Sequence, residues 1–371
     1  MTMIIGWLHG ERPFLVSDTA QTQRWEPRWG TSSFGEAPHE TSDGRFVEEG
    51  AAKIFGLGSA GVAAVCGATN SGIEFVRELR VYIARPDLVD TIIDLGQRLE
   101  TKVQVPFEVL IARGGEMVLF RSYEPSRPQR IDPDQVIVLG SAPDILKEVA
   151  NWSVRRGARF KSPEDQLVLT VSTLQLLGAQ NYLPQFGIGG AFYGCFVDSA
   201  VQWLRDTLFL IVPPLAAPES TSRPPHLKEV GIEHVLVAVR DGWVCRTSSA
   251  VDATKEAAIW VLVPELAPDE FSNVVEGAWR AAWSLEVQTV MSEKRVRYLV
   301  LLSNAYAHMT VIDVFHSEPG KFMALRGGQT AFNPDLINGF QSWRPSASEG
   351  ARLYFISDRG FRNDETEPEG A

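Results

Sequence analysis

The stretch KIFGLGSAGVAAVCG, residues 53–67, decides how the first half of the chain is interpreted. Three of its glycines have the spacing G-x-G-x-x-G of a dinucleotide-binding turn. Such a turn leads directly into a helix whose first amides face a pyrophosphate. The residues after Gly61 are instead small and β-branched, and Gly67 interrupts them, which favours a strand. The sequence therefore predicts a β-hairpin with strands at 53–57 and 62–66, and a nucleotide site only if 62–66 is helical.

Helical patterns follow this hairpin in pairs. Apolar residues recur at three- and four-residue spacing in 71–85, and a second helix is predicted at 87–101. Another pair is predicted at 142–157 and 163–181, the last opened by a serine cap and a proline. Strands, two helices, strands, two helices and strands in this order predict two stacked antiparallel sheets with helices outside. This is a four-layer αββα sandwich of the α+β class.

Composition shifts along the chain predict its domain organisation. Residues 1–213 form the sandwich domain, and the proline-rich segment 214–227 is a linker. Residues 228–359 are predicted to form a smaller α+β domain of unassigned role, and the acidic segment 360–371 a disordered tail. Within the first domain, the polar segment 19–50 is predicted to be a long loop.

The second domain is predicted from short β-prone runs and one helical pattern. We expect its elements at 234–239, 243–248, 258–263, 297–302 and 309–315 (strands) and at 268–285 (helix).

Charge and cysteine usage exclude several function classes. The 371 residues carry a formal net charge of −11, which argues against binding to nucleic acid or to an anionic membrane. The three cysteines and six histidines show no metal-ligand spacing, and the cysteines suit a reducing compartment. The sequence has no apolar run of about eighteen residues and no signal peptide pattern. We therefore expect a cytoplasmic protein without a metal or another cofactor.

The opening Met1-Thr2, followed at once by an apolar β-prone run, suggests one specific chemistry. Methionine is commonly removed before a small second residue, which would give Thr2 a free α-amine. An α-amine has a pKa near 8 and can act as the general base for the hydroxyl on the same residue. This arrangement needs no catalytic histidine.

Residues 2–213 resemble the N-terminal nucleophile hydrolases of the proteasome β-subunit and HslV type. The resemblance includes the order of strands and helices and the motif residues that punctuate them. Five residues of this chain match the family's motif in order and context: Thr2, Asp18, Lys53, Gly67 and Ser141. Lys53 is also the only lysine in the first 101 residues, where the other basic residues are arginines.

The resemblance implies an acyl transfer that cleaves peptide or other amide bonds. Thr2 would be the nucleophile, Asp18 would hold Lys53 beside it, and the Gly67 N–H would stabilise the oxyanion. Ser141 would lie near the terminal amine. The resemblance further implies that no cofactor is needed, that the chain forms a homo-oligomer, and that an ATPase can be its partner.

Three departures from the family leave alternatives open. Asp18 and Lys53 are separated by 34 residues, more than in the family, and 183–190 lacks the acidic residue that usually follows the last helix. The C-terminal domain is not part of the family plan. A catalytically inactive scaffold or binding protein is the main alternative function, and a nucleotide-binding enzyme is the third.

Overall fold

The computed structural model describes most of the first 204 residues and separate strands beyond them. The described residues are 3–24, 39–41, 43–49, 52–59, 61–99, 105–133, 135–158, 162–179, 183, 186–189, 192–204, 207–212, 234–239, 243–248, 298–306, 309–316, 323–326, 329–332 and 351–357. The chain divides into two compact units. The first is Met1–Asp206 with Leu236–Thr247 and Ala258–Val287, and the second is Thr207–Val235, Ser248–Ala257 and Gln288–Ala371.

The first sheet of the first unit has the strand order β11-β1-β2-β12-β13. Its strands are β1 (Met3–His9), β2 (Arg12–Asp18), β11 (Val136–Gly140), β12 (Phe192–Val197) and β13 (Val201–Trp203). All neighbours are antiparallel, with Met3 opposite Gly140 and Phe192 opposite Asp18. Four strand ends therefore lie side by side, namely the start of β1, the end of β2, the end of β11 and the start of β12. The side of the sheet that these strand ends form is called its edge below.

The second sheet has the order β10-β9-β8-β7-β6 and is also antiparallel. Its strands are β6 (Ile54–Gly56), β7 (Gly61–Gly67), β8 (Phe107–Arg113), β9 (Glu116–Arg121) and β10 (Gln129–Arg130). The predicted hairpin is confirmed, and the Leu57 N–H closes its turn on the Gly61 carbonyl at 2.8 Å. Because residues 62–66 are strand, the dinucleotide interpretation is wrong.

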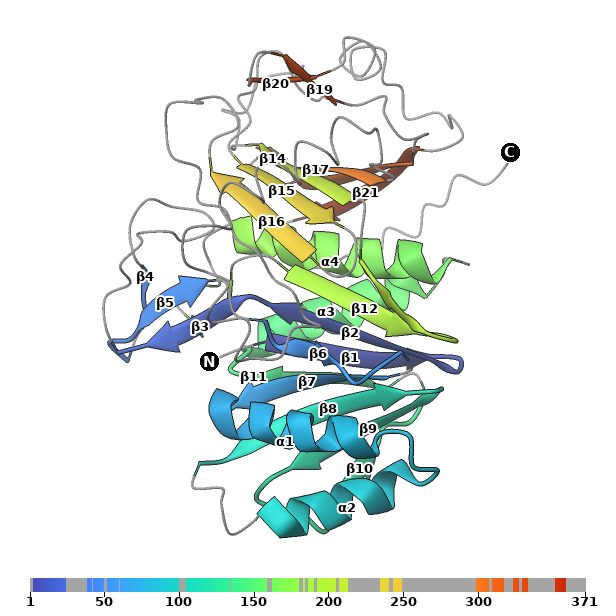
Figure 1. Cartoon of the computed structure of the whole chain (residues 1–371). Helices are drawn as coiled ribbons and strands as arrows, with labels where there is room; N and C mark the ends of the chain where they lie inside the picture. The colour runs from blue at the N-terminus through green and yellow to red at the C-terminus, as the bar shows by residue number, and fades with distance from the viewer. Residues whose placement is uncertain are drawn as a thin grey trace. The chain divides into compact units, whose positions relative to one another are not determined.

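Four helices lie on the outer faces of the two sheets (Figure 1). They are α1 (Thr69–Tyr82), α2 (Leu88–Leu99), α3 (Asp144–Gly157) and α4 (Pro163–Ala179). Helices α1 and α2 pack on the second sheet, α3 and α4 on the first, and the sheets face each other through β1, β2, β7 and β8. The order is helices, sheet, sheet, helices, and the predicted α+β class is confirmed.

The helix starts and ends agree with the predictions to within a few residues. Helix α4 begins where the sequence places its cap, because the Ser162 hydroxyl accepts the Asp165 N–H at 3.4 Å. None of the described helices is long and apolar enough to cross a membrane.

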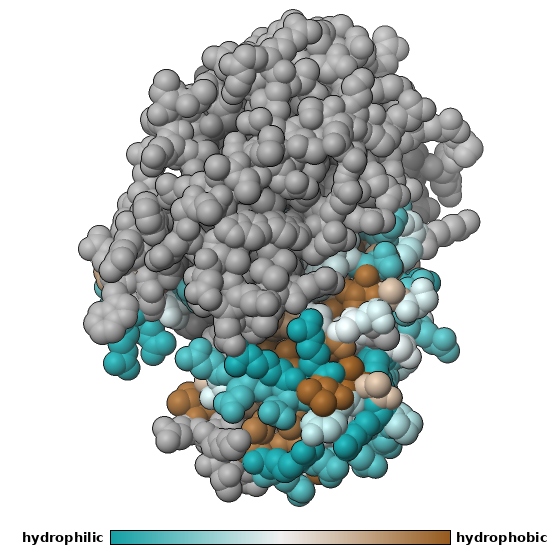
Figure 2. All heavy atoms as spheres, viewed as in Figure 1, coloured by the Kyte–Doolittle hydropathy of each residue, from teal (hydrophilic) through white to brown (hydrophobic). Residues whose placement is uncertain are grey.

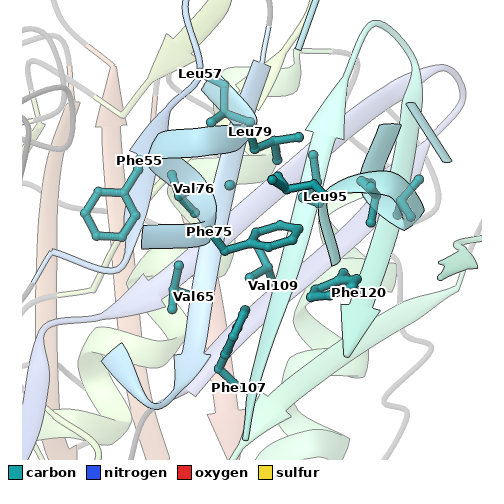
Figure 3. Close-up of a cluster of buried hydrophobic side chains, with 14 of the residues drawn as sticks. Phe55, Leu57, Val65, Phe75, Val76, Leu79, Leu95, Phe107, Val109 and Phe120 are labelled. Atoms are coloured by element: carbon teal, nitrogen blue, oxygen red, sulfur yellow. The ribbon is translucent and has the colours of Figure 1, made fainter. Parts of the chain in front are cut away.

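The core between the second sheet and its helices is aromatic at its centre (Figure 3). Phe75 of α1 stacks on Phe120 of β9 with ring centroids 4.4 Å apart, and Phe107 of β8 packs against both rings. Leu79 and Leu95 fill the space between the helices and the strands. This packing fixes β7 and β8, whose ends lead to the site described below.

The predicted loop 19–50 is corrected in part by the structure. It contains a three-stranded antiparallel sheet in the order β3-β5-β4, made of β3 (Ala20–Gln23), β4 (His39–Glu40) and β5 (Phe46–Glu49). These strands are two to four residues long and largely polar, so no hydrophobic alternation reveals them. Their pairing between segments distant in sequence supplies the backbone hydrogen bonds that local propensity does not.

Beyond residue 206 the structure describes strands. In the second unit β14 (Thr207–Val212) runs parallel to β17 (Tyr298–Tyr306), followed by β18 (Met309–His316) and β21 (Ala351–Ser357) in antiparallel pairs. The hairpin of β19 (Met323–Arg326) and β20 (Gln329–Phe332) is separate. Strands β15 (His234–Val239) and β16 (Trp243–Ser248) form where they were predicted.

Several predictions for the chain beyond residue 206 stay untested. The strand at 258–263 and the helix at 268–285 lie outside the described residues. Strand β14, which the sequence placed at the end of the first domain, pairs with β17 of the second unit. The limits of the predicted domains, linker and tail stay predictions.

The described surface of the first unit mixes polar and apolar side chains. Figure 2 shows hydrophilic residues interspersed with small hydrophobic areas on the face in view. Three large hydrophobic side chains are exposed in the described part, Val81, Val105 and Tyr123, at 73%, 55% and 56%. Single exposed apolar side chains of this kind are ordinary on protein surfaces.

The close approach of β12 to β2 predicts a strong effect of Gly194→Ala. A Cβ atom on Gly194 would lie 2.5 Å from the Leu15 carbonyl oxygen, which is backbone and cannot move aside. We expect this variant to lose about 2 kcal/mol or more in its free energy of unfolding in urea. Gly157→Ala is the matched control, because its Cβ would lie an ordinary 3.5 Å from Gln166. Equal stability of the two variants would contradict the described packing.

Candidate functional site at a buried lysine–aspartate pair

One edge of the two sheets carries a buried ion pair between Lys53 and Asp18. The Lys53 Nζ lies 2.5 Å from Asp18 Oδ1, and the two side chains are only 7% and 0% exposed. Asp18 is the last residue of β2, and Lys53 directly precedes β6. Val65 of β7 donates its N–H to the Lys53 carbonyl at 2.8 Å, which holds the lysine at the edge of the second sheet.

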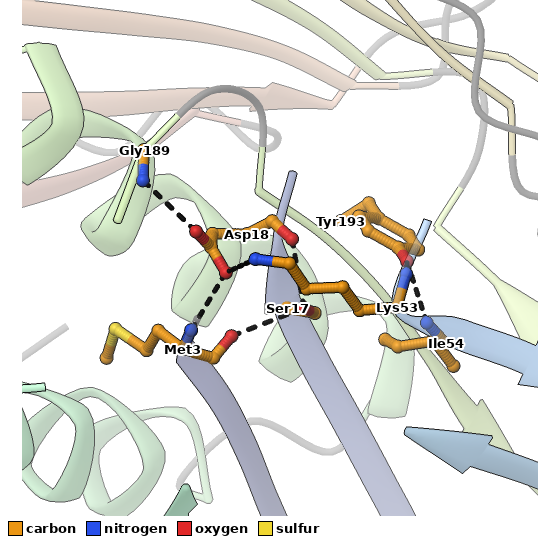
Figure 4. Close-up of polar contacts among 7 residues, drawn as sticks. All are labelled: Met3, Ser17, Asp18, Lys53, Ile54, Gly189 and Tyr193. Carbon is orange, nitrogen blue, oxygen red and sulfur yellow. Dashed lines mark hydrogen bonds and ion pairs between the residues drawn. The ribbon is translucent and has the colours of Figure 1, made fainter. Parts of the chain in front are cut away.

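The Asp18 carboxylate accepts hydrogen bonds from two further groups (Figure 4). The Met3 N–H donates to Oδ1 at 2.9 Å, and the Gly189 N–H donates to Oδ2 at 3.1 Å. The hydroxyl of Ser17, the residue before Asp18, donates a hydrogen bond to the Met3 carbonyl at 3.2 Å. A carboxylate with an ammonium and two amides as donors is a well-satisfied buried anion. The start of β1 is therefore tied directly to the charged pair.

Opposing effects act on the Lys53 ammonium. Burial lowers the pKa of Lys53 and is the largest effect, while the charge and hydrogen bond of Asp18 oppose it. A buried ion pair seldom stabilises a fold beyond what apolar residues would achieve, because both ions lose their hydration. Buried ionisable groups held by a specific partner are frequent at functional sites, so this pair marks the candidate site.

Tyr193 holds the backbone beneath the ion pair. Its hydroxyl oxygen accepts the N–H groups of Lys53 at 2.6 Å and of Ile54 at 2.8 Å. The tyrosine lies in β12, is 1% exposed, and its pKa is raised by burial. It is therefore a neutral hydroxyl at neutral pH.

Cys66 is a described thiol that interacts electrostatically with the ion pair. Its side chain is buried in β7, where it feels the charges of Lys53 and Asp18, and burial raises its pKa to about 12. The thiol is protonated at neutral pH and is not a candidate nucleophile. Among the described residues, no group of three or more His, Cys, Asp and Glu side chains could hold a metal ion.

The structure brings two of the predicted site residues into contact and places two more near the same edge. Asp18 and Lys53 form the ion pair, whereas Thr2 lies outside the described residues. Gly67 ends β7 two residues after Val65, with φ +93°, and its substitution would bring a Cβ to 2.9 Å from the Pro106 carbonyl. Ser141 is exposed and follows Gly140, which is paired with Met3. Their catalytic roles stay predictions.

Sequence reasoning missed two residues that shape the site, Gly189 and Tyr193. Gly189 lies in the segment 183–190, which attracted attention only because it lacks an acidic residue. Its backbone N–H donates to Asp18 Oδ2. Every residue except proline has such an N–H, so the sequence does not reveal this contact. Tyr193 is part of the apolar run of β12, where an aromatic residue indicates only a strand.

Comparisons with known proteins give a similarity to solved structures. No family model matches the sequence, and no curated protein matches it. Among solved structures, the chain is similar to eukaryotic HslV from Trypanosoma brucei, with a TM-score of 0.38 and 12% sequence identity. The similar region covers 53% of this chain and 99% of the HslV chain. A similarity at this level does not assign a function. The proposal below therefore rests on the geometry around Lys53 and Asp18.

The ion pair predicts a large stability loss in Asp18→Asn. The neutral amide leaves the buried Lys53 ammonium without a counter-charge. It also replaces one of the two acceptor oxygens, to which Lys53, Met3 and Gly189 donate, with an NH₂ group. We expect the free energy of unfolding in urea to fall by about 3–5 kcal/mol. Combining it with Lys53→Met removes the buried charge, so the double variant should lose clearly less than the sum of the two single losses.

The matched control is the exposed pair of Lys147 and Asp144, whose Nζ–Oδ1 distance is 2.9 Å. Asp144→Asn should leave the free energy of unfolding nearly unchanged, because solvent screens this pair. An Asp18→Asn variant as stable as Asp144→Asn would show that the pair is not buried as described.

Proposed function

We propose that this protein is a threonine-type N-terminal nucleophile hydrolase that cleaves peptide or other amide bonds. In this proposal Met1 is removed, and Thr2 supplies both the attacking hydroxyl and the basic α-amine. The observation that carries the proposal is the hydrogen bond from the Met3 N–H to Asp18, which ties the start of β1 to the Lys53 ammonium. Thr2 is joined to that same Met3 nitrogen by its peptide bond.

The chemistry of the pair suits an alkoxide-forming nucleophile. A buried ammonium favours the deprotonated form of a nearby hydroxyl, because its field is weakly screened in the interior. Asp18 accepts at least three donors from the described residues, so it orients Lys53 rather than accepting the proton of the nucleophile. The α-amine is then the base that receives this proton.

The proposed reaction proceeds by acyl transfer. The Thr2 hydroxyl oxygen attacks the carbonyl carbon of the substrate as its proton moves to the α-amine. The Gly67 N–H stabilises the oxyanion, a contact typically worth about 3 kcal/mol. The C–N bond breaks, the leaving amine takes the proton, and water hydrolyses the resulting ester to release the acid and regenerate Thr2. Ser141 is proposed to orient the terminal amine.

The wider features of the proposal rest on the resemblance of residues 2–213. They are a homo-oligomer, gating by an ATPase partner and a cytoplasmic location. The alternative is a chain of the same fold in which no catalysis remains and which serves as a scaffold or binding protein.

A peptide epoxyketone tests the proposed nucleophile, because it closes a ring only on a hydroxyl and a free amine carried by one residue. The hydroxyl adds to the ketone and the amine opens the epoxide, so the protein gains the full mass of the probe. We expect one adduct per chain, mapped by mass spectrometry to a peptide that begins with Thr2. Thr2→Ala should form none, and Thr2→Ser should retain it.

Lysine variants separate the proposal from unspecific labelling. Lys53→Ala should slow adduct formation about 100-fold or more, because the charge beside the nucleophile is lost. Lys147→Ala, at an exposed position of α3, should leave the rate unchanged. Labelling that survives Thr2→Ala would contradict the proposed nucleophile. No labelling of a chain that begins with Thr2 would favour the inactive scaffold.

A further inference from the structure

The hydroxyl oxygen of Tyr193 accepts two consecutive backbone N–H groups, those of Lys53 and Ile54. In a regular strand, consecutive N–H groups point to opposite sides, so one acceptor cannot serve both. The chain therefore bends around the tyrosine oxygen where it enters β6. This bend lies directly beneath the side chain that meets Asp18 (Figure 4).

The tyrosine ring is held firmly enough to fix this bend. Tyr193 is 1% exposed and stacks with Trp203 of β13, with ring centroids 6.5 Å apart and an interplanar angle of 20°. Tyr193 is also paired with Ser17 in the register of β12 and β2, next to Asp18. The position of the Tyr193 oxygen is thus set by the pairing of β12 with β2, the strand that carries Asp18.

The segment that leads into β12 also fixes Asp18 from the other side. The Gly189 N–H donates to Asp18 Oδ2, and the Gly189 carbonyl accepts the N–H groups of Thr19 at 3.2 Å and Ala20 at 3.1 Å. Gly189 and Tyr193 therefore hold the two ends of the 34-residue segment that separates Asp18 from Lys53. The length of that segment makes such a tie necessary, because long connections do not hold their ends together by themselves.

We infer that Tyr193 is a positioning residue, which places the Lys53 ammonium on Asp18 by fixing the backbone at Lys53 and Ile54. It acts through the backbone of Lys53 and Ile54, to which its hydroxyl oxygen is bonded. Its effect on Lys53 stands by itself, whereas its effect on a reaction rate rests on the proposed function.

The test is Tyr193→Phe, which removes the acceptor and keeps the ring. The first measurement is the pKa of Lys53. It is determined by an NMR titration of the full chain with lysine labelled at the ε-position. Burial is the largest cause of the lowered pKa of Lys53, so a backbone that is no longer fixed should admit water. We expect the pKa to rise toward the ordinary lysine value of 10.5.

The second measurement is the reaction with the peptide epoxyketone. We expect the maximal rate of adduct formation to fall about tenfold or more, because small displacements at a reacting centre have effects of this size. The concentration for half-maximal rate should change by less than about twofold, since Tyr193 does not line the substrate. A merely structural role would not lower the maximal rate while leaving the concentration for half-maximal rate unchanged.

Two control variants separate positioning from general destabilisation. Tyr123→Phe removes an exposed hydroxyl that is bonded to Glu108, and neither measurement should change. Val197→Ala creates a cavity at the far end of β12, so it should lower the stability while the pKa of Lys53 stays as in the unaltered chain.

Each outcome bears on the inference separately from the proposed function. An unchanged pKa of Lys53 in Tyr193→Phe overturns the inference, whether or not the chain reacts with the probe. A raised pKa with an unchanged rate, in a chain that reacts, overturns the role in the reaction. If the probe never reacts, the proposed function fails and the pKa still decides the positioning role. Should Tyr193→Phe not fold, fast hydrogen exchange of the Lys53 and Ile54 amides in the unaltered chain would overturn the inference, and slow exchange would support it.

Discussion

The arrangement of the first unit depends on one electrostatic constraint, the burial of Lys53 against Asp18 at the edge of two stacked sheets. Both side chains are buried, so each charge must be compensated by fixed protein groups. Backbone amides from β1 and from the segment before β12 complete the carboxylate, and a tyrosine oxygen fixes the lysine backbone. Four segments distant in sequence therefore have to converge on a single pair of side chains.

This convergence explains why the two sheets and their outer helices matter for function. The helices α1 and α2 fix the second sheet through an aromatic core, and that sheet holds Lys53 through the N–H of Val65. The first sheet supplies Asp18 and the start of β1. The Met3 N–H donates to the carboxylate that holds the ammonium. We propose that a terminal nucleophile at Thr2 is activated there by a fixed positive charge.

The sequence predicted those features that local patterns encode. Glycines and β-branched residues marked the hairpin of β6 and β7, and apolar spacing with the Ser162 cap marked the helices. The pairing of Asp18 with Lys53 was implied by the family resemblance, and the structure brings these two side chains together. The short sheet of β3, β4 and β5 was missed, because its stability comes from non-local pairing. Gly189 and Tyr193 were missed because one acts through its backbone and the other looks like an ordinary strand residue.

The proposed reaction requires Thr2 to be the terminal residue, with its α-amine free. The most direct measurement is the mass of the N-terminal peptide of the protein isolated from its native source. We expect a peptide that begins with Thr2 and reacts with amine reagents, which shows a free α-amine. A peptide that retains Met1, or whose Thr2 amine is blocked, would rule out Thr2 as the nucleophile.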